Sequence, residues 1–173
     1  IMANITLGGN PIHTIGSLPE VGTMIPDFKL VKSDLSVLTY NDLKGKRVIF
    51  NIFPSLDTST CAASVRQFNV KAASLDNTVV VCVSKDLPFA HNRFCVAEGI
   101  KNVITGSAFR DDSFGNAFGV TIADSGFQGL LARSVVVVDE KGTVIYTEQV
   151  AETANEPDYD TALNAVELKH LAN

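Results

Sequence analysis

The chain has no tryptophan, few cysteines and no long apolar run. A membrane-spanning helix needs about 20 consecutive apolar residues, and no segment of this sequence comes near that length. Its first residues also lack the positively charged start and the apolar stretch of a secretory signal. These absences favour a cytoplasmic protein that does not enter a membrane.

Basic residues are also scarce. The 14 Lys and Arg residues are outnumbered by 19 Asp and Glu residues, so the formal net charge is −5. Nucleic-acid recognition needs a basic face, and binding to a membrane surface needs a block of like charges. His13, His91 and His170 share no metal-ligand spacing. The sequence therefore predicts no nucleic-acid partner, no membrane partner and no metal.

Three cysteines cannot form a disulfide framework, and bridges in a reducing compartment are usually transient and catalytic. Cys82 lies in the β-branched run 78–83, which is typical of a strand buried on both faces, and buried structural thiols are inert. Cys61 has a different setting. It follows an apolar strand at 46–53, which Pro54 ends, and it precedes a stretch with apolar residues at helical spacing. The chain thus carries Cys61 from a strand end toward the start of a helix.

This position favours a reactive Cys61. The first turn of a helix offers free backbone N–H groups and the positive end of the helix dipole, and both stabilise a thiolate. A cysteine among small residues can equally be a small core residue, so the local pattern leaves both interpretations open. Cys95 shifts the balance toward reactivity. It lies 34 residues further along, in a second helical stretch that begins at Pro88 and ends at Gly99.

The length of 173 residues is that of one domain, and we expect a single domain over residues 3–171. The expected elements are a hairpin at 4–15, short strands at 28–31 and 35–38, a helical turn at 41–45, a strand at 47–53, a helix at 62–75, a strand at 78–84, a helix at 88–99, a strand at 103–105, a short helix at 111–119, a hairpin of strands 133–139 and 143–147, and a helix from 157. The central β-α-β-α-β order predicts a largely parallel sheet with helices packed on it. Sites in such sheets lie at the carboxyl ends of the strands, which is where Cys61 is expected.

Several segments resemble one known family. The pattern Pro54-x-x-x-Thr58-x-x-Cys61 resembles the active-site motif of the peroxiredoxins, which are thiol-dependent peroxidases. The opening hairpin and residues 93–99, 129–139 and 156–159 are similar to the bacterial thiol peroxidase subfamily, an atypical two-cysteine group. The similarity runs from about residue 3 to 171. It implies an α/β, thioredoxin-like fold with a central mixed sheet flanked by helices and an N-terminal β-hairpin extension.

The resemblance also implies roles for individual residues. Cys61 corresponds to the peroxidatic cysteine and Cys95 to the resolving cysteine. Thr58 corresponds to the hydroxyl that contacts the thiolate and the peroxide, Arg133 to the guanidinium beside them, and Pro54 to the residue that shields the pocket from water. Without the resemblance, Arg133 would be interpreted as a solvated surface charge, and Thr58 would be interpreted as a helix cap. The sequence itself does not show that the side chains of Thr58 and Arg133 lie close to Cys61.

The function implied is reduction of hydrogen peroxide and alkyl hydroperoxides in antioxidant defence. Cys61 would become a sulfenic acid, an intramolecular disulfide with Cys95 would follow, and thioredoxin would restore both thiols. No cofactor is implied, and a homodimer is expected by resemblance.

Three alternatives remain at this stage. One is a protein thiol–disulfide oxidoreductase, against which the absence of Cys-x-x-Cys counts. A second is a non-enzymatic thioredoxin-like binding or chaperone module. A third is a hydrolase with a Cys61–His91 pair, although nothing in the sequence indicates an oxyanion-hole loop.

Overall fold

The computed structural model describes the backbone of residues 2–172 and the side chains of residues 2–167, so the side chain of His170 lies outside the described part. Nine strands occur along this part of the chain: β1 (Asn4–Leu7), β2 (Asn10–His13), β3 (Leu30–Val31), β4 (Val37–Leu38), β5 (Arg47–Ile52), β6 (Thr78–Ser84), β7 (Ile104–Ser107), β8 (Ser134–Val138) and β9 (Val144–Gln149). The helices are the 3-10 helix η1 (Tyr40–Leu43) and the α-helices α1 (Ser59–Ala72), α2 (Pro88–Glu98), α3 (Ser113–Phe118) and α4 (Tyr159–Ala172).

Seven strands form one sheet in the order β4-β3-β7-β6-β5-β8-β9. The central strands β5, β6 and β7 are parallel, as the β-α-β-α-β pattern predicted. The outer pairs are antiparallel: β8 runs against β5 and β9, and β3 runs against β7 and β4. The short β3–β4 and β8–β9 connections force antiparallel pairing, so the sheet as a whole is mixed.

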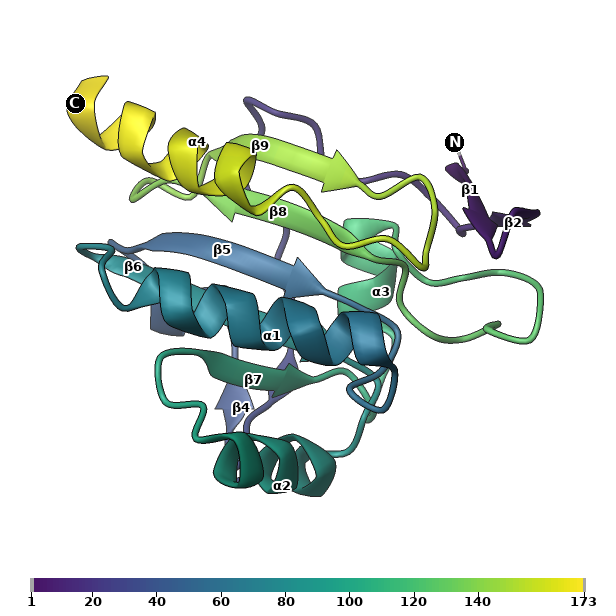
Figure 1. Ribbon diagram of the computed structural model, residues 1–173. Helices are drawn as coiled ribbons and strands as arrows, with labels where there is room; N and C mark the ends of the chain where they lie inside the picture. The colour runs from purple at the N-terminus through teal and green to yellow at the C-terminus, as the bar shows by residue number, and fades with distance from the viewer. Residues whose placement is uncertain (1, 173) are drawn as a thin grey trace.

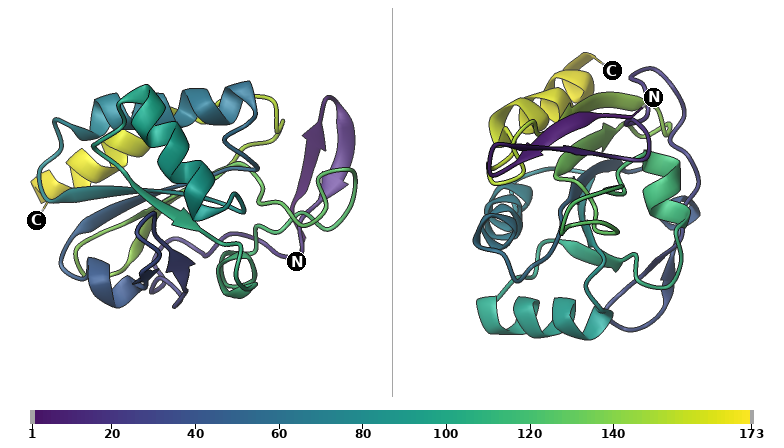
Figure 2. Two further views of the ribbon diagram at one scale, coloured as in Figure 1. Left: turned by 90° about the horizontal axis from the view of Figure 1, so that it is seen from below. Right: turned by 90° about the vertical axis from the view of Figure 1, so that its right-hand side faces the viewer.

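Helices cover both faces of this sheet. Helices α1, α2 and α4 lie on one face, whereas η1 and α3 lie on the other (Figures 1 and 2). Successive residues of a strand point to opposite faces, so β5 sends Phe50 to the α3 side and Ile49 to the α1 side. Both residues are completely buried. This two-sided burial explains why the central strands are almost continuously apolar.

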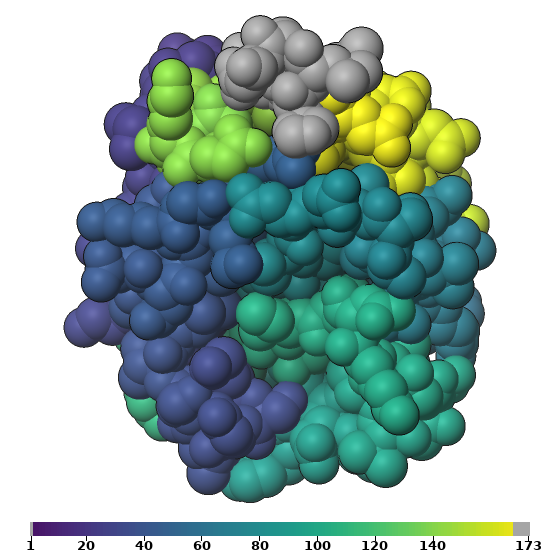
Figure 3. Space-filling view, turned by 90° about the vertical axis from the view of Figure 1, so that its left-hand side faces the viewer, coloured from purple at the N-terminus to yellow at the C-terminus, as the bar shows by residue number. Residues whose placement is uncertain are grey.

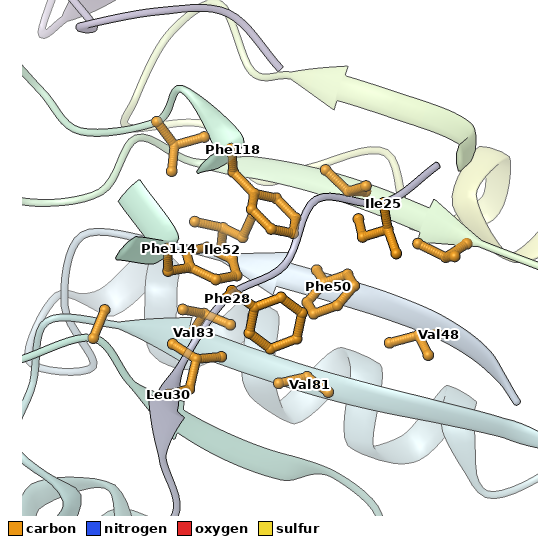
Figure 4. Packing of buried hydrophobic residues seen from close by; sticks show 14 of the residues in the cluster. Ile25, Phe28, Leu30, Val48, Phe50, Ile52, Val81, Val83, Phe114 and Phe118 are labelled. Carbon is orange, nitrogen blue, oxygen red and sulfur yellow. The ribbon is translucent and has the colours of Figure 1, made fainter. Parts of the chain in front are cut away.

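Aromatic rings fill the core on the α3 side. Phe28, Phe50, Phe114 and Phe118 pack together there (Figure 4), and the rings of Phe114 and Phe118 are stacked with centroids 4.1 Å apart. On the opposite side, α1 contributes a stripe of buried residues that includes Cys61. The apolar packing that holds α1 on the sheet therefore also fixes the position of this thiol.

Most expected elements are confirmed, with shifts at their ends. Helix α2 ends at Gly99, whose φ of 66° is the left-handed conformation that glycine favours. Helix α1 begins three residues before the expected position, because Thr58 already has the extended backbone of an N-cap. Strands β3 and β4 have only two residues each, since the chain turns through a positive φ at Leu35.

The N-terminal hairpin is a separate two-stranded sheet. Its turn uses Gly8 and Gly9, both with positive φ, as a tight hairpin turn requires. The hairpin lies at the end of the main sheet, beside the loop that follows β9 (Figure 2). Backbone bonds join it to this loop, from Thr6 N to Ala151 O (2.8 Å) and from Thr153 N to Thr6 O (2.8 Å). Of the helices in the described chain, none has both the length and the hydropathy needed to cross a membrane.

Candidate active site

Cys61 lies at the carboxyl edge of the sheet, where the strand pattern predicted it. Strand β5 ends at Ile52, the chain passes through the buried Pro54, and α1 begins at Ser59 (Figure 1). Cys61 is the third residue of α1 and is completely buried. The sulfur is therefore shielded from bulk solvent in this structure.

The first turn of α1 leaves its backbone donors available. The first helical hydrogen bond runs from Ala62 N to Thr58 O (3.0 Å). The N–H groups of the three preceding residues, including Cys61, therefore have no partner within the helix. They concentrate partial positive charge at the start of the helix, where the sulfur lies.

Arg133 is the side chain that the structure brings to Cys61. It immediately precedes β8, and the pairing of Ser134 with Ile52 brings it to the edge where β5 ends. Only 2% of Arg133 is exposed. Its Nη2 donates to the sulfur of Cys61 across 3.2 Å, and its Nε donates to the carbonyl of Thr153 across 3.0 Å. The interpretation of Arg133 as a solvated surface charge is therefore wrong.

The Arg133 guanidinium carries a positive charge that no acidic side chain of the described residues balances. No carboxylate of the described residues lies within ion-pair distance of this guanidinium. A buried cation is costly without a counter-charge, and the nearest candidate is the Cys61 sulfur. The Nη1 atom of Arg133 is also buried and has no partner in the described part of the chain. It is a free donor beside the sulfur.

Thr58 and Pro54 are both near Cys61 in the chain, but their side chains have different settings. Pro54 is buried in the loop between β5 and α1. The Thr58 hydroxyl donates to the carbonyl of Ser55 across 3.0 Å. Among the described residues, the hydrogen bond to the Cys61 sulfur comes from Arg133 and not from Thr58. The hydrogen bond expected from the Thr58 hydroxyl to the sulfur is therefore not present among the described residues.

Cys82 is a core residue, as its strand context predicted. It is completely buried in β6, and the Asn51 amide donates to its sulfur across 3.6 Å. Burial raises the pKa of Cys82 to about 12, so this thiol stays protonated at neutral pH. The Asn51 bond opposes the shift without cancelling it.

Cys95 is half-buried on α2, and burial raises the pKa of its thiol as well. It lines a hollow of about 310 Å³ between α2, β7 and the turn before β4. This hollow opens on the face away from the N-terminal hairpin (Figure 3). All three cysteines are free thiols in this structure.

The residues around Cys61 include two that the sequence analysis missed. Thr153 accepts the hydrogen bond from Arg133 through its backbone carbonyl. No sequence pattern identifies a backbone carbonyl that binds an arginine 20 residues earlier in the chain. Asp86 binds the loop before Cys61, with its carboxylate 2.8 Å from Leu56 N. His91, considered as a partner of Cys61, instead lies 2.8 Å from the hydroxyl of Ser84. Within the described residues, no three His, Cys, Asp or Glu side chains cluster as metal ligands would.

Comparison with known proteins agrees with this geometry. Residues 20–163 match the Redoxin family model. The chain is 56% identical over 165 residues to the protein named Thiol peroxidase from Mycobacterium tuberculosis, covering 95% of this chain and 99% of that protein. A protein of the same name from Corynebacterium glutamicum is 53% identical with the same coverage.

Solved structures share the fold. A peroxiredoxin-like protein from Aquifex aeolicus has a TM-score of 0.91 and 36% identity, over 96% of this chain and 98% of that one. The thiol peroxidase from Chromobacterium violaceum has a TM-score of 0.88 over 96% of this chain and 97% of that one. Its sequence identity to this chain is 20%, so the similarity concerns the fold alone. The expected thioredoxin-like fold with a mixed sheet and an N-terminal hairpin is confirmed.

Proposed function

This chain belongs to the Redoxin family, and on that premise we propose that Cys61 is the peroxidatic cysteine of a thiol peroxidase and Cys95 its resolving cysteine. The protein is a thiol-dependent peroxidase. The observation that carries the assignment of Cys61 is the hydrogen bond of 3.2 Å from the buried Arg133 to its sulfur. A thiolate beside a cation and a helix N-terminus is the nucleophile that this reaction needs.

The first step is attack of the Cys61 thiolate on one oxygen of the hydroperoxide. The S–O bond forms as the O–O bond breaks, and the departing alkoxide or hydroxide takes up a proton to become alcohol or water. Negative charge grows on the departing oxygen, which needs fixed donors. The free Nη1 of Arg133 can supply one. The Thr58 hydroxyl lies at the N-cap one turn before the sulfur, and it can supply another when its single proton turns from the Ser55 carbonyl to the departing oxygen.

The second step joins Cys61 to Cys95. The Cys95 thiol attacks the sulfenic sulfur, a disulfide forms, and water leaves. Cys95 is the eighth residue of α2, which places it about 10 Å along the helix axis from Pro88. Cys61 is instead in the first turn of its own helix. We propose that α2, the first turn of α1, or both must unfold locally, since a disulfide needs Cα atoms within roughly 7 Å.

An external dithiol then reduces the disulfide by exchange, and we propose thioredoxin for this role. Hydrogen peroxide and alkyl hydroperoxides are the proposed substrates. The proposal includes a cytoplasmic location, because three free cysteines and a dithiol reductant belong in a reducing compartment. It also includes a homodimer and a single domain over residues 3–171. Pro54 shields the Cys61 pocket from water in this scheme.

Single-cysteine variants test the assignment in a peroxidase assay coupled to thioredoxin and its reductase. Cys61→Ser should abolish turnover, because a serine hydroxyl does not ionise near neutral pH. Cys95→Ser should lose thioredoxin-dependent turnover but still consume one equivalent of peroxide. Cys82→Ser should remain nearly as active as the wild type, since its thiol is buried and protonated.

Mass spectrometry identifies the products. After one equivalent of peroxide, non-reducing peptide maps should show a Cys61–Cys95 bridge within one chain and the loss of two hydrogens. Excess peroxide should convert Cys61 of the Cys95→Ser variant to sulfinic acid. A bridge that contains Cys82, or one that joins two chains, would contradict the proposed cysteine roles.

A further inference from the structure

Helix α2, which carries Cys95, is attached to the sheet through few buried residues. Only Pro88 and His91 are buried among its 11 residues, whereas α1 buries six residues. Phe89 and Val96 of α2 are 66% and 74% exposed. Burial of apolar surface is the main force that holds a helix in place. Phe94 packs only in part against the core, so the hydrogen bond of His91 is one of the few buried contacts that hold α2 in place.

His91 reaches into a buried hydrogen-bond network at the carboxyl end of β6. Its Nε2 lies 2.8 Å from the Ser84 hydroxyl, which lies 2.6 Å from a carboxylate oxygen of Asp86. An ionised carboxylate only accepts, so Ser84 donates to Asp86 and His91 Nε2–H donates to Ser84. The Nδ1 atom of His91 is buried without a partner among the described residues. The Ser84 hydroxyl is thus the one described hydrogen-bond partner of this ring.

The same carboxylate binds the loop that leads to Cys61. One oxygen of Asp86 accepts from the Ser55 hydroxyl at 2.8 Å, and the other accepts from Leu56 N at 2.8 Å. Both helices begin at the edge of the sheet where this network lies (Figure 1). Asp86 therefore connects the Cys61 loop, through Ser84 and His91, to the helix of Cys95.

This network does not have the arrangement of a hydrolase triad. The serine lies between the acid and the histidine, so its proton points to Asp86 instead of to the base. Ser84 is also completely buried, and no substrate reaches its oxygen. The bonds of the network can position the two segments relative to each other, which is a different role from chemistry on a substrate.

We propose that His91, Ser84 and Asp86 form a latch that keeps the Cys95 helix folded against the Cys61 loop, and that opening of this latch sets the rate of disulfide formation. The inference rests on the proposed function of Cys61 and Cys95. Cys95 lies one helical turn after His91, so release of His91 frees the part of α2 that must reach Cys61. These three are positioning residues, since none of them contacts the sulfur of Cys61 in the described structure.

The latch also determines how much Cys61 is over-oxidised. The sulfenic acid has two fates: condensation with the Cys95 thiol, which yields the disulfide and water, or reaction with a second hydrogen peroxide, which yields sulfinic acid and water. The first fate requires opening of α2 and the second does not. A tighter latch should therefore favour sulfinic acid, and a weaker latch should favour the disulfide.

Ser84→Ala is the primary test, because it leaves both nitrogens of the buried His91 unpaired. An unpaired buried polar group destabilises the folded helix, so we expect disulfide formation to be roughly tenfold faster. Reduced protein is mixed with one equivalent of hydrogen peroxide, quenched at intervals with dimedone and N-ethylmaleimide, and analysed by mass spectrometry. At excess peroxide, the same variant should give less sulfinic acid than the wild type.

Two control variants separate the latch from general loosening of α2. In His91→Gln, the amide can donate to Ser84 from about the position of Nε2, so its rate should match the wild type. Arg93→Met breaks the exposed ion pair between α2 and Asp57, and exposed pairs contribute little, so its rate should also be unchanged. A folded Ser84→Ala protein whose disulfide forms no faster than in the wild type would overturn the proposal.

Hydrogen exchange of the fully reduced protein tests the latch without any peroxide chemistry. Backbone amides of residues 88–98 should exchange faster in Ser84→Ala than in the wild type or His91→Gln, because local opening becomes easier. Unchanged exchange would overturn the latch even if the cysteine roles are correct. Faster exchange together with failure of the wild type to form a Cys61 sulfenic acid would instead contradict the proposed function.

Discussion

At the scale of single residues, the chemistry depends on one arginine. Arg133 is buried, and the described partners of its guanidinium are the sulfur of Cys61 and the carbonyl of Thr153. Neither partner is a carboxylate, so its positive charge is available to the thiolate and to the departing oxygen. An arginine neutralised by an acid could not stabilise these groups as strongly.

Arg133→Met should slow peroxide consumption on the order of a hundredfold, the usual cost of losing a preorganised donor to developing charge. It should also slow the alkylation of Cys61 by iodoacetamide at neutral pH, since the sulfur loses the cation beside it. The measurement uses a Cys82→Ser, Cys95→Ser background so that only one thiol reacts.

The matched control for this variant is Arg110→Met, which removes an exposed arginine and should leave both readouts unchanged. Arg133→Lys keeps the charge but loses the second donor of the guanidinium. It should therefore preserve more of the alkylation rate than of the peroxide rate. An alkylation rate of Arg133→Met identical to that of the parent would show that Arg133 does not stabilise the thiolate.

At the scale of elements, the N-terminal hairpin braces the loop that holds Arg133. The Glu152 carboxylate accepts from Gly9 N (2.7 Å), Gly8 N (3.2 Å), the Thr6 hydroxyl (3.0 Å) and Ala154 N (2.7 Å). These bonds lower the pKa of Glu152 to about 2. The next residue, Thr153, offers its carbonyl to Arg133. The hairpin is thus connected to the sulfur of Cys61 through one loop and one side chain.

Glu152→Gln should loosen this brace, because the amide nitrogen cannot accept the bonds that the second carboxylate oxygen accepted. We expect a several-fold slower reaction with peroxide and a smaller loss of Cys61 alkylation rate than in Arg133→Met. Glu20→Gln, which also removes an exposed acid, is the control. If the two variants behave alike, the hairpin has no part in placing Arg133.

At the scale of the whole molecule, two acid–base groups link folding to pH. Burial lowers the pKa of His91 to about 4 from its ordinary 6.5, and the nearby Asp86 charge opposes this shift only in part. The unfolded chain therefore binds a proton at this position before the folded protein does. The contribution of His91 to the free energy of unfolding is therefore fully present above about pH 6.5 and is lost as the pH falls toward 4. The pKa of Glu152 is lowered on folding, as is usual for an acid. Its contribution to the free energy of unfolding is therefore lost as the pH falls from about 4.5 toward 2.

Urea unfolding between pH 7.5 and about 3.5 measures the contributions of His91 and Glu152. The wild type should lose roughly 3 kcal/mol of unfolding free energy to this group on full titration, as the lowered pKa implies. His91→Gln should lose much less over the same range, because no buried group at position 91 then takes up a proton. Glu152→Gln is the contrasting variant. It should keep the wild-type slope near pH 6 and differ below pH 4.5, and equal slopes in all three proteins would refute the assignment.

The sequence by itself determined the local structure around the reactive thiol. Apolar spacing and Pro54 predicted the β5–α1 junction, and Pro88 and Gly99 predicted both ends of α2. The β-branched run around Cys82 predicted its burial. These features depend on the backbone preferences of neighbouring residues and on the periodicity of strands and helices, so they can be read along the chain without knowledge of distant contacts.

Only the tertiary structure decided which distant groups meet. Arg133 lies 72 residues after Cys61 and reaches it because β8 pairs with β5 in a register that places Ser134 opposite Ile52. A shift of one residue would have turned Arg133 to the other face of the sheet. The bond from His91 to Ser84 likewise depends on how α2 packs against β7 and reaches the end of β6. Strand register and helix packing result from the whole core, so no local pattern specifies them.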